Sequence, residues 1–78
     1  MTENVTDTVR AIVADALQVS LDDVAATLEF GGIKQWDSMG HMEIMLRLEA
    51  QFGVEVSEET ITTLTSIPAM CAHIEKKG

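Results

Sequence analysis

The longest helical pattern in the chain is WDSMGHMEIMLRLEAQFG, residues 36–53. Asp37 and Ser38 are residue types that cap a first helical turn, and Gly53 is typical of the position after a last turn. The pattern therefore predicts a helix that begins at Asp37 or Ser38 and stops before Gly53. Apolar side chains cover more than half of its circumference, which indicates several helical neighbours, although Glu49 also falls inside this arc. The apolar residues are Met39, Met42, Ile44, Met45, Leu46, Leu48 and Phe52.

An earlier helix is predicted at the start of the chain. Asn4 or Thr6 could cap it, and its pattern ends near Ser20. Its charged residues, Asp7, Arg10 and Asp15, lie off the apolar stripe. The apolar residues at helical spacing are Val5, Val9, Ile12, Val13, Ala16 and Leu17.

The stretch between these two helices, residues 20–35, shows no sustained period and contains Gly31-Gly32. It predicts a long connecting loop with one helical turn near residues 22–26. Such a loop is uncommon unless it is functional or is held by its own apolar residues, which here are Leu21, Val24, Leu28, Phe30 and Ile33. We expect Trp36 to pack over these residues; the alternative is a partly exposed ring that contacts partners.

Two shorter helices are predicted after residue 53. Ser57 begins a brief helix that reaches Thr62 or Thr63, because β-branched threonines disfavour a long one. Ser66 caps a last helix, in which Pro68 falls in the tolerated first turn. The buried face of this last helix is predicted to contain Ile67, Met70, Cys71 and Ile74.

The predicted fold is therefore all-α: a four-helix bundle with three main helices and a short third helix. At 78 residues we expect one domain, residues 1–78, whose core comes from helix packing, since the single cysteine, Cys71, is expected to be buried and to form no internal disulfide. Residues 1–4 lack the basic start of a secretory signal, and no segment approaches the roughly 18 apolar residues of a membrane span. We therefore expect a cytoplasmic monomer without membrane insertion.

The chain is acidic, with a formal net charge of −8. This charge opposes binding to nucleic acid or to an anionic membrane. Residues 22–59 hold nine of the acidic residues against two basic ones, a formal charge of −7. An acidic surface around the helix after Ser38 favours basic partners, and the alternative is that the charge serves only solubility.

The helix pattern resembles that of the acyl carrier proteins. Their usual sequence motif is D-S-L, a polar pair, an apolar residue, Glu, and an alternation that ends in E-x-x-F-G. The residues that match without a gap are Asp37, Ser38, Met39, Met42, Glu43, Ile44, Leu48, Glu49, Phe52 and Gly53. The resemblance continues to Ile74 and extends more loosely over the first helix, so it covers nearly the whole chain.

This resemblance implies that the hydroxyl of Ser38 is joined to 4′-phosphopantetheine, which coenzyme A donates and whose thiol carries an acyl group as a thioester. It implies that Asp37 lies near the place where a phosphopantetheinyl transferase and its magnesium act. It also implies that Asp37, Glu43 and Glu49 face basic docking patches on acyl-loading and acyl-processing enzymes, with Met39 and Met42 beside them. The protein is then a carrier with no catalytic residues and no resident metal.

Each residue has a simpler interpretation from spacing alone. Ser38 could be only a helix cap. Gly40 leaves room for the arm or a partner, or it marks a frayed helix end. His41 is expected to be a solvated or packing residue, and the alternative is that it approaches the phosphate of the arm. Asp37, Ser38 and His41 are too close along one helical turn for a hydrolase triad, and Cys71 and His73 with His41 do not suggest a metal site.

Met39, Met42 and Met45 give the helix a flexible stripe of thioether side chains. Such side chains repack easily, so they suit an interior that opens to shelter an acyl chain, and they suit ordinary core packing equally well. Both interpretations stay open from the sequence.

The differences from the family motif indicate the kind of pathway in which the carrier acts. Gly40-His41 replaces the usual polar pair, and Arg47 with Ala50 lowers the acidity of the helix. We therefore expect an acyl carrier in a specialised lipid or secondary-metabolite pathway rather than in housekeeping fatty acid synthesis. One alternative is an aminoacyl or peptidyl carrier, and another is a small acidic interaction module in which Ser38 carries no prosthetic group.

Overall fold

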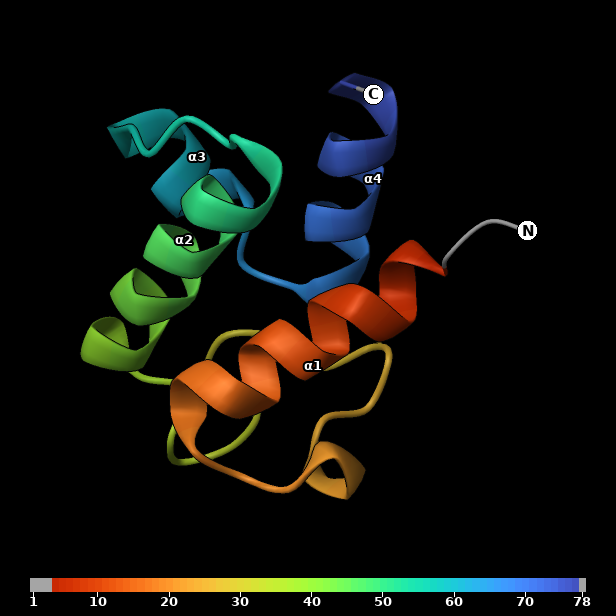
Figure 1. Ribbon diagram of the computed structural model, residues 1–78. Coiled ribbons are helices and arrows are strands. Elements are labelled where there is room, and N and C mark those ends of the chain that lie inside the picture. Colours follow the sequence, from red (N-terminus) through yellow and green to blue (C-terminus); the bar gives the residue numbers. More distant parts are fainter. Residues whose placement is uncertain (1–3, 78) are drawn as a thin grey trace.

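The computed structural model describes residues 4–77. The start of the chain, on which the expectation about a secretory signal partly rests, lies outside this range. The described residues form four α-helices and no extended strand: α1 (Val5–Leu17), α2 (Ser38–Phe52), α3 (Glu58–Thr63) and α4 (Ile67–Lys77), with a short 3-10 helix, η1 (Leu21–Asp23). The predicted all-α fold with a short third helix is confirmed (Figure 1).

Local capping explains where α1 begins and ends. The Asn4 side chain accepts a hydrogen bond from the Thr6 N–H at 2.9 Å, so Asn4 is the cap. Gln18 adopts the left-handed conformation, with φ of 58°, and its N–H donates to the carbonyls of the last turn. The helix therefore ends at Leu17, and the predicted end near Ser20 was too late.

The later helices follow the sequence closely. Ser57 and Thr60 form a reciprocal capping box, in which the Thr60 hydroxyl accepts from the Ser57 N–H at 2.9 Å. The Ser66 hydroxyl accepts from the Ala69 N–H at 3.2 Å, so Ser66 caps α4 as predicted. No described helix has the length and apolar character needed to cross a bilayer.

The core lies where the helices meet, with α1 packed against both α2 and α4, and with α3 against α2 (Figure 1). Burial at these contacts removes apolar surface from water and is the main stabilising term. Trp36 is 1% exposed, so the prediction that it packs in the interior is confirmed, as is the predicted burial of Cys71. The other buried apolar residues are Val9, Val13, Ala14, Leu17, Val24, Ile44, Met45, Leu48, Val54, Leu64, Ile67 and Met70.

The long loop lies beneath α1 in Figure 1 and differs from the prediction in two respects. Its helical turn is η1, which begins after the Ser20 cap, earlier than residues 22–26. Leu21 is exposed and does not hold the loop as predicted, whereas Val24 is completely buried. Phe30 is also partly exposed, but its ring contacts the His41 ring edge-on. Backbone carbonyls of this loop also have hydrogen-bond partners, in addition to the apolar contacts.

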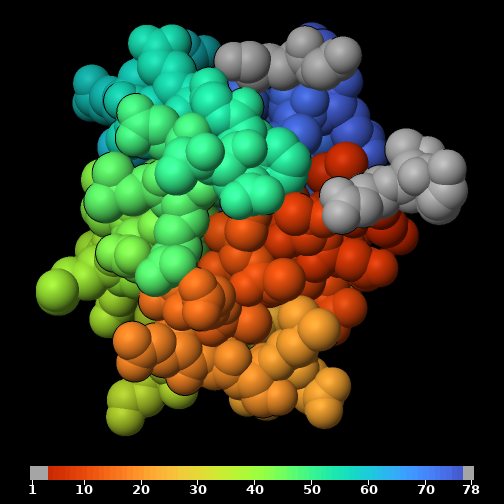
Figure 2. Space-filling view, viewed as in Figure 1, coloured from red at the N-terminus to blue at the C-terminus, as the bar shows by residue number. Residues whose placement is uncertain are grey.

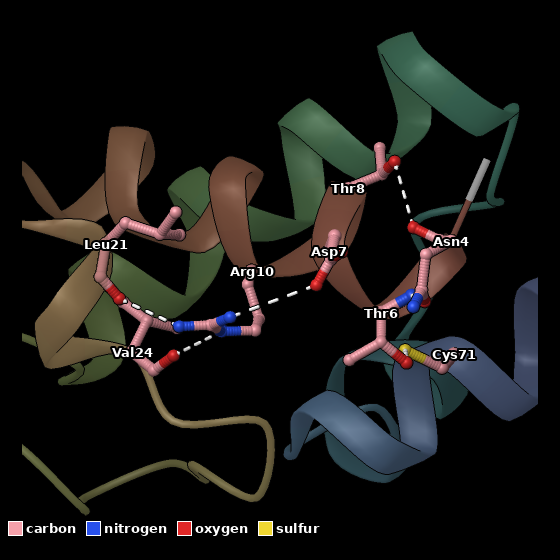
Figure 3. Close-up of polar contacts among 8 residues, drawn as sticks. All are labelled: Asn4, Thr6, Asp7, Thr8, Arg10, Leu21, Val24 and Cys71. Atoms are coloured by element: carbon pink, nitrogen blue, oxygen red, sulfur yellow. Dashed lines mark hydrogen bonds and ion pairs between the residues drawn. The ribbon is translucent and has the colours of Figure 1, made fainter.

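Arg10 supplies those partners (Figure 3). Its Nε–H donates to the carbonyl of Val24 at 2.6 Å, and its Nη2 donates to the carbonyl of Leu21 at 3.1 Å. The guanidinium group also lies 3.9 Å from Asp7. Since Arg10 lies on α1, these bonds hold the turn after α1 against the helix that precedes it. In the first turn of α1, the Cys71 thiol contacts the Thr6 hydroxyl at 3.6 Å and links α4 to α1 (Figure 3).

Candidate functional site

Ser38 is the first residue of α2, and its side chain is exposed. The preceding residue, Asp37, caps the helix as predicted, because its Oδ1 accepts from the Gly40 N–H at 2.9 Å. Its carbonyl accepts from the His41 N–H at 2.8 Å and closes the first helical bond. Asp37 thus fixes the turn on which Ser38 stands and leaves the Ser38 hydroxyl outside the capping bonds.

A cavity of about 390 Å³ opens next to Ser38. Its wall comes from the long loop, from α2, and from α3 with the residues that follow it, so helix packing brings distant parts of the sequence together here. The lining is mostly apolar. The lining residues are Phe30, Ser38, His41, Met42, Ile61, Thr62 and Thr65. No sequence pattern associates Ile61, Thr62 or Thr65 with Ser38, because no local motif marks a cavity wall.

His41 is a packing residue, as expected, and is 4% exposed. Its Nδ1 accepts from the Trp36 Nε1–H at 3.0 Å, and its Nε2 lies 2.8 Å from the Ile61 carbonyl. The Trp36 ring stacks beside it, and the Phe30 ring meets it edge-on. With both ring nitrogens engaged, His41 forms the inner wall of the cavity.

Gly40 fills a different role from either of those expected from the sequence. A Cβ atom at this position would lie 2.5 Å from the Gln35 carbonyl oxygen and 2.7 Å from Cδ2 of Leu17. The space that a side chain would occupy is therefore taken by the loop and by α1. The glycine permits close packing of the first turn of α2 onto the protein, and neither an arm, a partner nor a frayed end is needed to explain it.

The buried face of α2 is narrower than the apolar arc suggested. Met45, Ile44 and Leu48 are in the core, but three further apolar side chains face solvent: Met39 is 83% exposed, Met42 38% and Leu46 49%. The thioether stripe is thus divided: Met45 packs in the core, Met42 lines the cavity and Met39 lies in solvent. Glu49 is exposed beside Leu46, three positions along the helix, so it no longer violates the pattern. In Figure 2, α2 (green) forms an edge of the molecule.

The charged residues of α2 differ in their ion pairs. Arg47 Nε donates to Glu43 Oε2 at 3.1 Å, and Arg47 Nη1 donates to Asp15 Oδ2 on α1 at 2.6 Å. Among the side chains of residues 4–76, Glu49 has no ion-pair partner. No local pattern indicates that Asp15 and Arg47 meet, since they lie on different helices.

Comparison with known proteins decides the family. Residues 7–74 match the family described as a phosphopantetheine attachment site. The chain is 34% identical to an acyl carrier protein of Akkermansia muciniphila over 97% of this chain and 96% of that protein. The chain belongs to the acyl carrier protein family. It is also 33% identical to an acyl carrier protein of Thermosynechococcus vestitus, over 88% and 85% of the two chains.

A further relative is named as a polyketide synthase carrier. The chain is 34% identical to polyketide-8 synthase acyl carrier protein 2 of Streptomyces avermitilis, over 74% of this chain and 67% of that protein. Membership of the acyl carrier proteins makes this chain a carrier and not an enzyme, with 4′-phosphopantetheine as its prosthetic group. It also implies interaction with a phosphopantetheinyl transferase and with acyl-processing enzymes.

The residues around Ser38 fit such a prosthetic group. An exposed hydroxyl at the start of a helix is accessible to a transferase, and a phosphate there meets the positive end of the helix dipole. The adjacent cavity is large enough for a flexible apolar group to enter beside the hydroxyl. Among the described residues, no three His, Cys, Asp or Glu side chains gather in a way that could hold a metal ion.

Proposed function

We propose that Ser38 is the attachment site of the 4′-phosphopantetheine arm, and that residues 1–78 act as one carrier domain. One observation carries this proposal: an exposed serine begins α2 at the rim of an apolar cavity. When attached, the arm supplies a thiol that holds an acyl group as a thioester. Asp37 keeps the first turn of α2 in place, and the turn presents Ser38 to the transferase.

The cavity beside Ser38 supports an acyl cargo over an aminoacyl cargo. Met42 and Ile61 present apolar groups, and His41 presents a ring whose two nitrogens already have partners. A charged α-amino group would gain no carboxylate from the residues that line this cavity, and its burial there would be costly. An apolar acyl segment would instead lose contact with water, which is favourable.

The chain delivers its cargo, in this proposal, to partner enzymes that dock on α2. The surface they meet includes Asp37, which caps α2, and Met39, Met42, Glu43 and Glu49, which lie along α2 from the turn that bears Ser38. Exposed ion pairs there would each contribute about 0 to 1 kcal/mol, which suits a carrier that binds and releases several enzymes in turn. The protein acts as a cytoplasmic monomer.

We place the carrier in a specialised lipid or secondary-metabolite pathway. The Arg47 ion pairs change the surface that partners meet, and partner choice depends on such residues. Gly40-His41, in place of the usual polar pair, offers partners no polar side chain there, because Gly40 has none and His41 is buried. The similarity to a polyketide synthase acyl carrier protein is in keeping with this assignment.

Intact-mass measurement tests the attachment. The apo protein is incubated with coenzyme A, magnesium and a broad-specificity phosphopantetheinyl transferase, beside Ser38→Ala and Ser66→Ala. Ser66 is the control serine because it also stands at the start of a helix, where its hydroxyl accepts from the Ala69 N–H. We expect the wild type and Ser66→Ala to gain one phosphopantetheinyl group and Ser38→Ala to gain none. If the folded wild type gains nothing while a control carrier is converted, the proposal is wrong.

A further inference from the structure

The cavity beside Ser38 ends before it reaches the core of the protein. Among the residues that the structure describes, none of the buried apolar side chains of the core lines this cavity. The buried residue in its wall is His41, which is 4% exposed. Trp36, a core residue, stacks beside His41 and is not part of the lining. The His41 ring therefore separates the cavity from the core.

The His41 ring is held by a polar contact at each nitrogen. Nδ1 accepts from the Trp36 indole N–H at 3.0 Å, and Nε2 lies 2.8 Å from the Ile61 carbonyl oxygen. Because α3 ends at Thr63, the Ile61 carbonyl is one of the last carbonyls of the helix, which have no partner within it. His41 supplies that partner and ties α3 to α2 at the inner end of the cavity.

Backbone hydrogen bonds between the long loop and the residues after α3 hold another part of the wall. The Phe30 N–H donates to the Thr65 carbonyl at 2.8 Å, and the Ile67 N–H donates to the Leu28 carbonyl at 3.0 Å. Phe30 and Thr65 both line the cavity. A longer occupant would therefore have to break these bonds to widen the cavity on this side.

An apolar chain that enters beside Ser38 is favoured until it reaches His41. Each methylene group that leaves water completely favours the bound position by about fourfold. Further entry would displace the imidazole ring and leave the Trp36 N–H and the Ile61 carbonyl unsatisfied. Each of these two losses disfavours entry by about 5- to 150-fold. The gain from one more methylene group does not offset the two losses together.

We infer that this carrier takes short acyl groups, up to about eight carbons, and that His41 is the residue that sets this limit. The inference rests on the proposed attachment at Ser38 and names the class of cargo. A volume of about 390 Å³ holds about a dozen groups of the size of a water molecule, at about 30 Å³ each, and the thioester takes part of this space. Longer acyl groups leave their distal carbons in solvent and do not pass between α2 and α3.

The protection of the thioester as a function of chain length tests this limit. The transferase loads Ser38 from coenzyme A thioesters of acetyl, butanoyl, octanoyl, decanoyl, dodecanoyl and hexadecanoyl groups. Cleavage by hydroxylamine is followed by intact mass, beside the same acyl groups on free pantetheine. We expect protection to rise by about tenfold from acetyl to octanoyl and to stay constant, within about twofold, up to hexadecanoyl.

The Trp36 indole gives a second measurement that does not depend on the thioester. Trp36 is the only tryptophan of the chain, so its N–H gives a single NMR signal of this type. Because the His41 bond should persist with every acyl group, exchange of this N–H with solvent should be equally slow in all loaded forms.

Ile61→Ala and Ile74→Ala separate a change in the cavity from a general loss of packing. Both isoleucines are partly buried against the core, but of the two only Ile61 lines the cavity. Ile61→Ala shortens the wall and keeps the carbonyl that His41 contacts, so protection should rise further, for about three more carbons. Ile74→Ala should leave the limit at octanoyl. His41→Ala should extend the limit to dodecanoyl, with circular dichroism as the check on folding; if this variant does not fold, Ile61→Ala decides.

Three results would overturn the inference while leaving the attachment at Ser38 intact. The first is protection in the wild type that keeps rising from octanoyl to hexadecanoyl. The second is an absence of protection at every chain length. The third is an equal shift of the limit in Ile61→Ala and Ile74→Ala. Failure of the transferase to load Ser38 at all would instead contradict the proposed function, so the two failures are distinguishable.

Discussion

Trp36 and His41 share a hydrogen bond of 3.0 Å in the interior, from the indole N–H to Nδ1 of the imidazole. Because an indole can only donate, Nδ1 must be unprotonated, and the proton of the neutral ring lies on Nε2. Nε2–H then donates to the Ile61 carbonyl at 2.8 Å. One side chain thus connects the loop before α2, the first turn of α2, and α3.

Replacement of His41 should reveal what these two bonds contribute. His41→Met keeps an apolar filler but leaves the Trp36 N–H and the Ile61 carbonyl without their partner. We expect a loss of about 2 to 4 kcal/mol in the free energy of unfolding, because each buried group left unsatisfied costs about 1 to 3 kcal/mol. His41→Gln can donate and accept, so it should lose less. Urea unfolding followed by circular dichroism measures both, and equal stability of His41→Met and wild type would contradict the prediction.

Gly40→Ala should destabilise the protein even though alanine favours helices. The added Cβ would meet the Gln35 carbonyl at 2.5 Å and Leu17 at 2.7 Å, so backbone must move. Overpacking of this kind costs about 1 to 3 kcal/mol, more than the gain of up to about 1 kcal/mol in helix propensity. We expect a lower midpoint of thermal unfolding. A midpoint equal to or above that of the wild type would show that the loop yields without cost.

Part of α2 could be predicted from local sequence, and the packing at Gly40 could not. The bounds of α2 and α3 could be predicted because caps such as Asp37 and Ser57 act within one turn. The proposal that Ser38 is the attachment site comes from its motif. The tight packing at Gly40 depends on the loop and on α1, which are distant in sequence, and no local rule could reveal it.

The exposed side of α2 could not be predicted for a related reason. Periodicity reports which residues are apolar, not which of them another element covers. Met39 and Leu46 fall in the predicted apolar arc, yet α1, α3 and α4 leave them in solvent. The ion pair between Arg47 and Asp15 likewise depends on how α1 crosses α2.

The C-cap residues of α1 and α2 both have the left-handed backbone conformation, so substitutions at the two positions can be compared. Gln18, with φ of 58°, and Gly53, with φ of 72°, occupy equivalent positions, but only glycine adopts this conformation without strain. Gln18→Gly should raise the free energy of unfolding by about 0.5 to 1 kcal/mol, and Gly53→Ala should lower it by about 1 kcal/mol. A Cβ added at Gly53 would have no heavy atom of another residue within 4 Å beyond its chain neighbours, so steric contact does not complicate the comparison. Urea unfolding of both variants measures these two changes in the free energy of unfolding. A loss of stability in Gln18→Gly would contradict the prediction.

The chain has two arginines, and the structure predicts that they differ in their contribution to stability. Arg10 donates to the carbonyls of Leu21 and Val24 and is a quarter exposed, whereas Arg47 forms more exposed pairs with carboxylates. Arg10→Met should cost about 1.5 to 3 kcal/mol, because charged hydrogen bonds to partly buried carbonyls are lost. Arg47→Met should cost less than about 1 kcal/mol.

Amide hydrogen exchange locates the effect of the Arg10 change. If Arg10 holds the loop, Arg10→Met should increase exchange at the Val24 amide, which bonds to the Leu21 carbonyl at 3.0 Å, and should leave α4 protected. Arg47→Met should not increase exchange there. Arg10→Lys keeps the charge but lacks the planar fork that reaches two carbonyls, so it should restore only part of the protection. Equal exchange at Val24 in Arg10→Met and wild type would show that burial of Val24 alone fixes the loop.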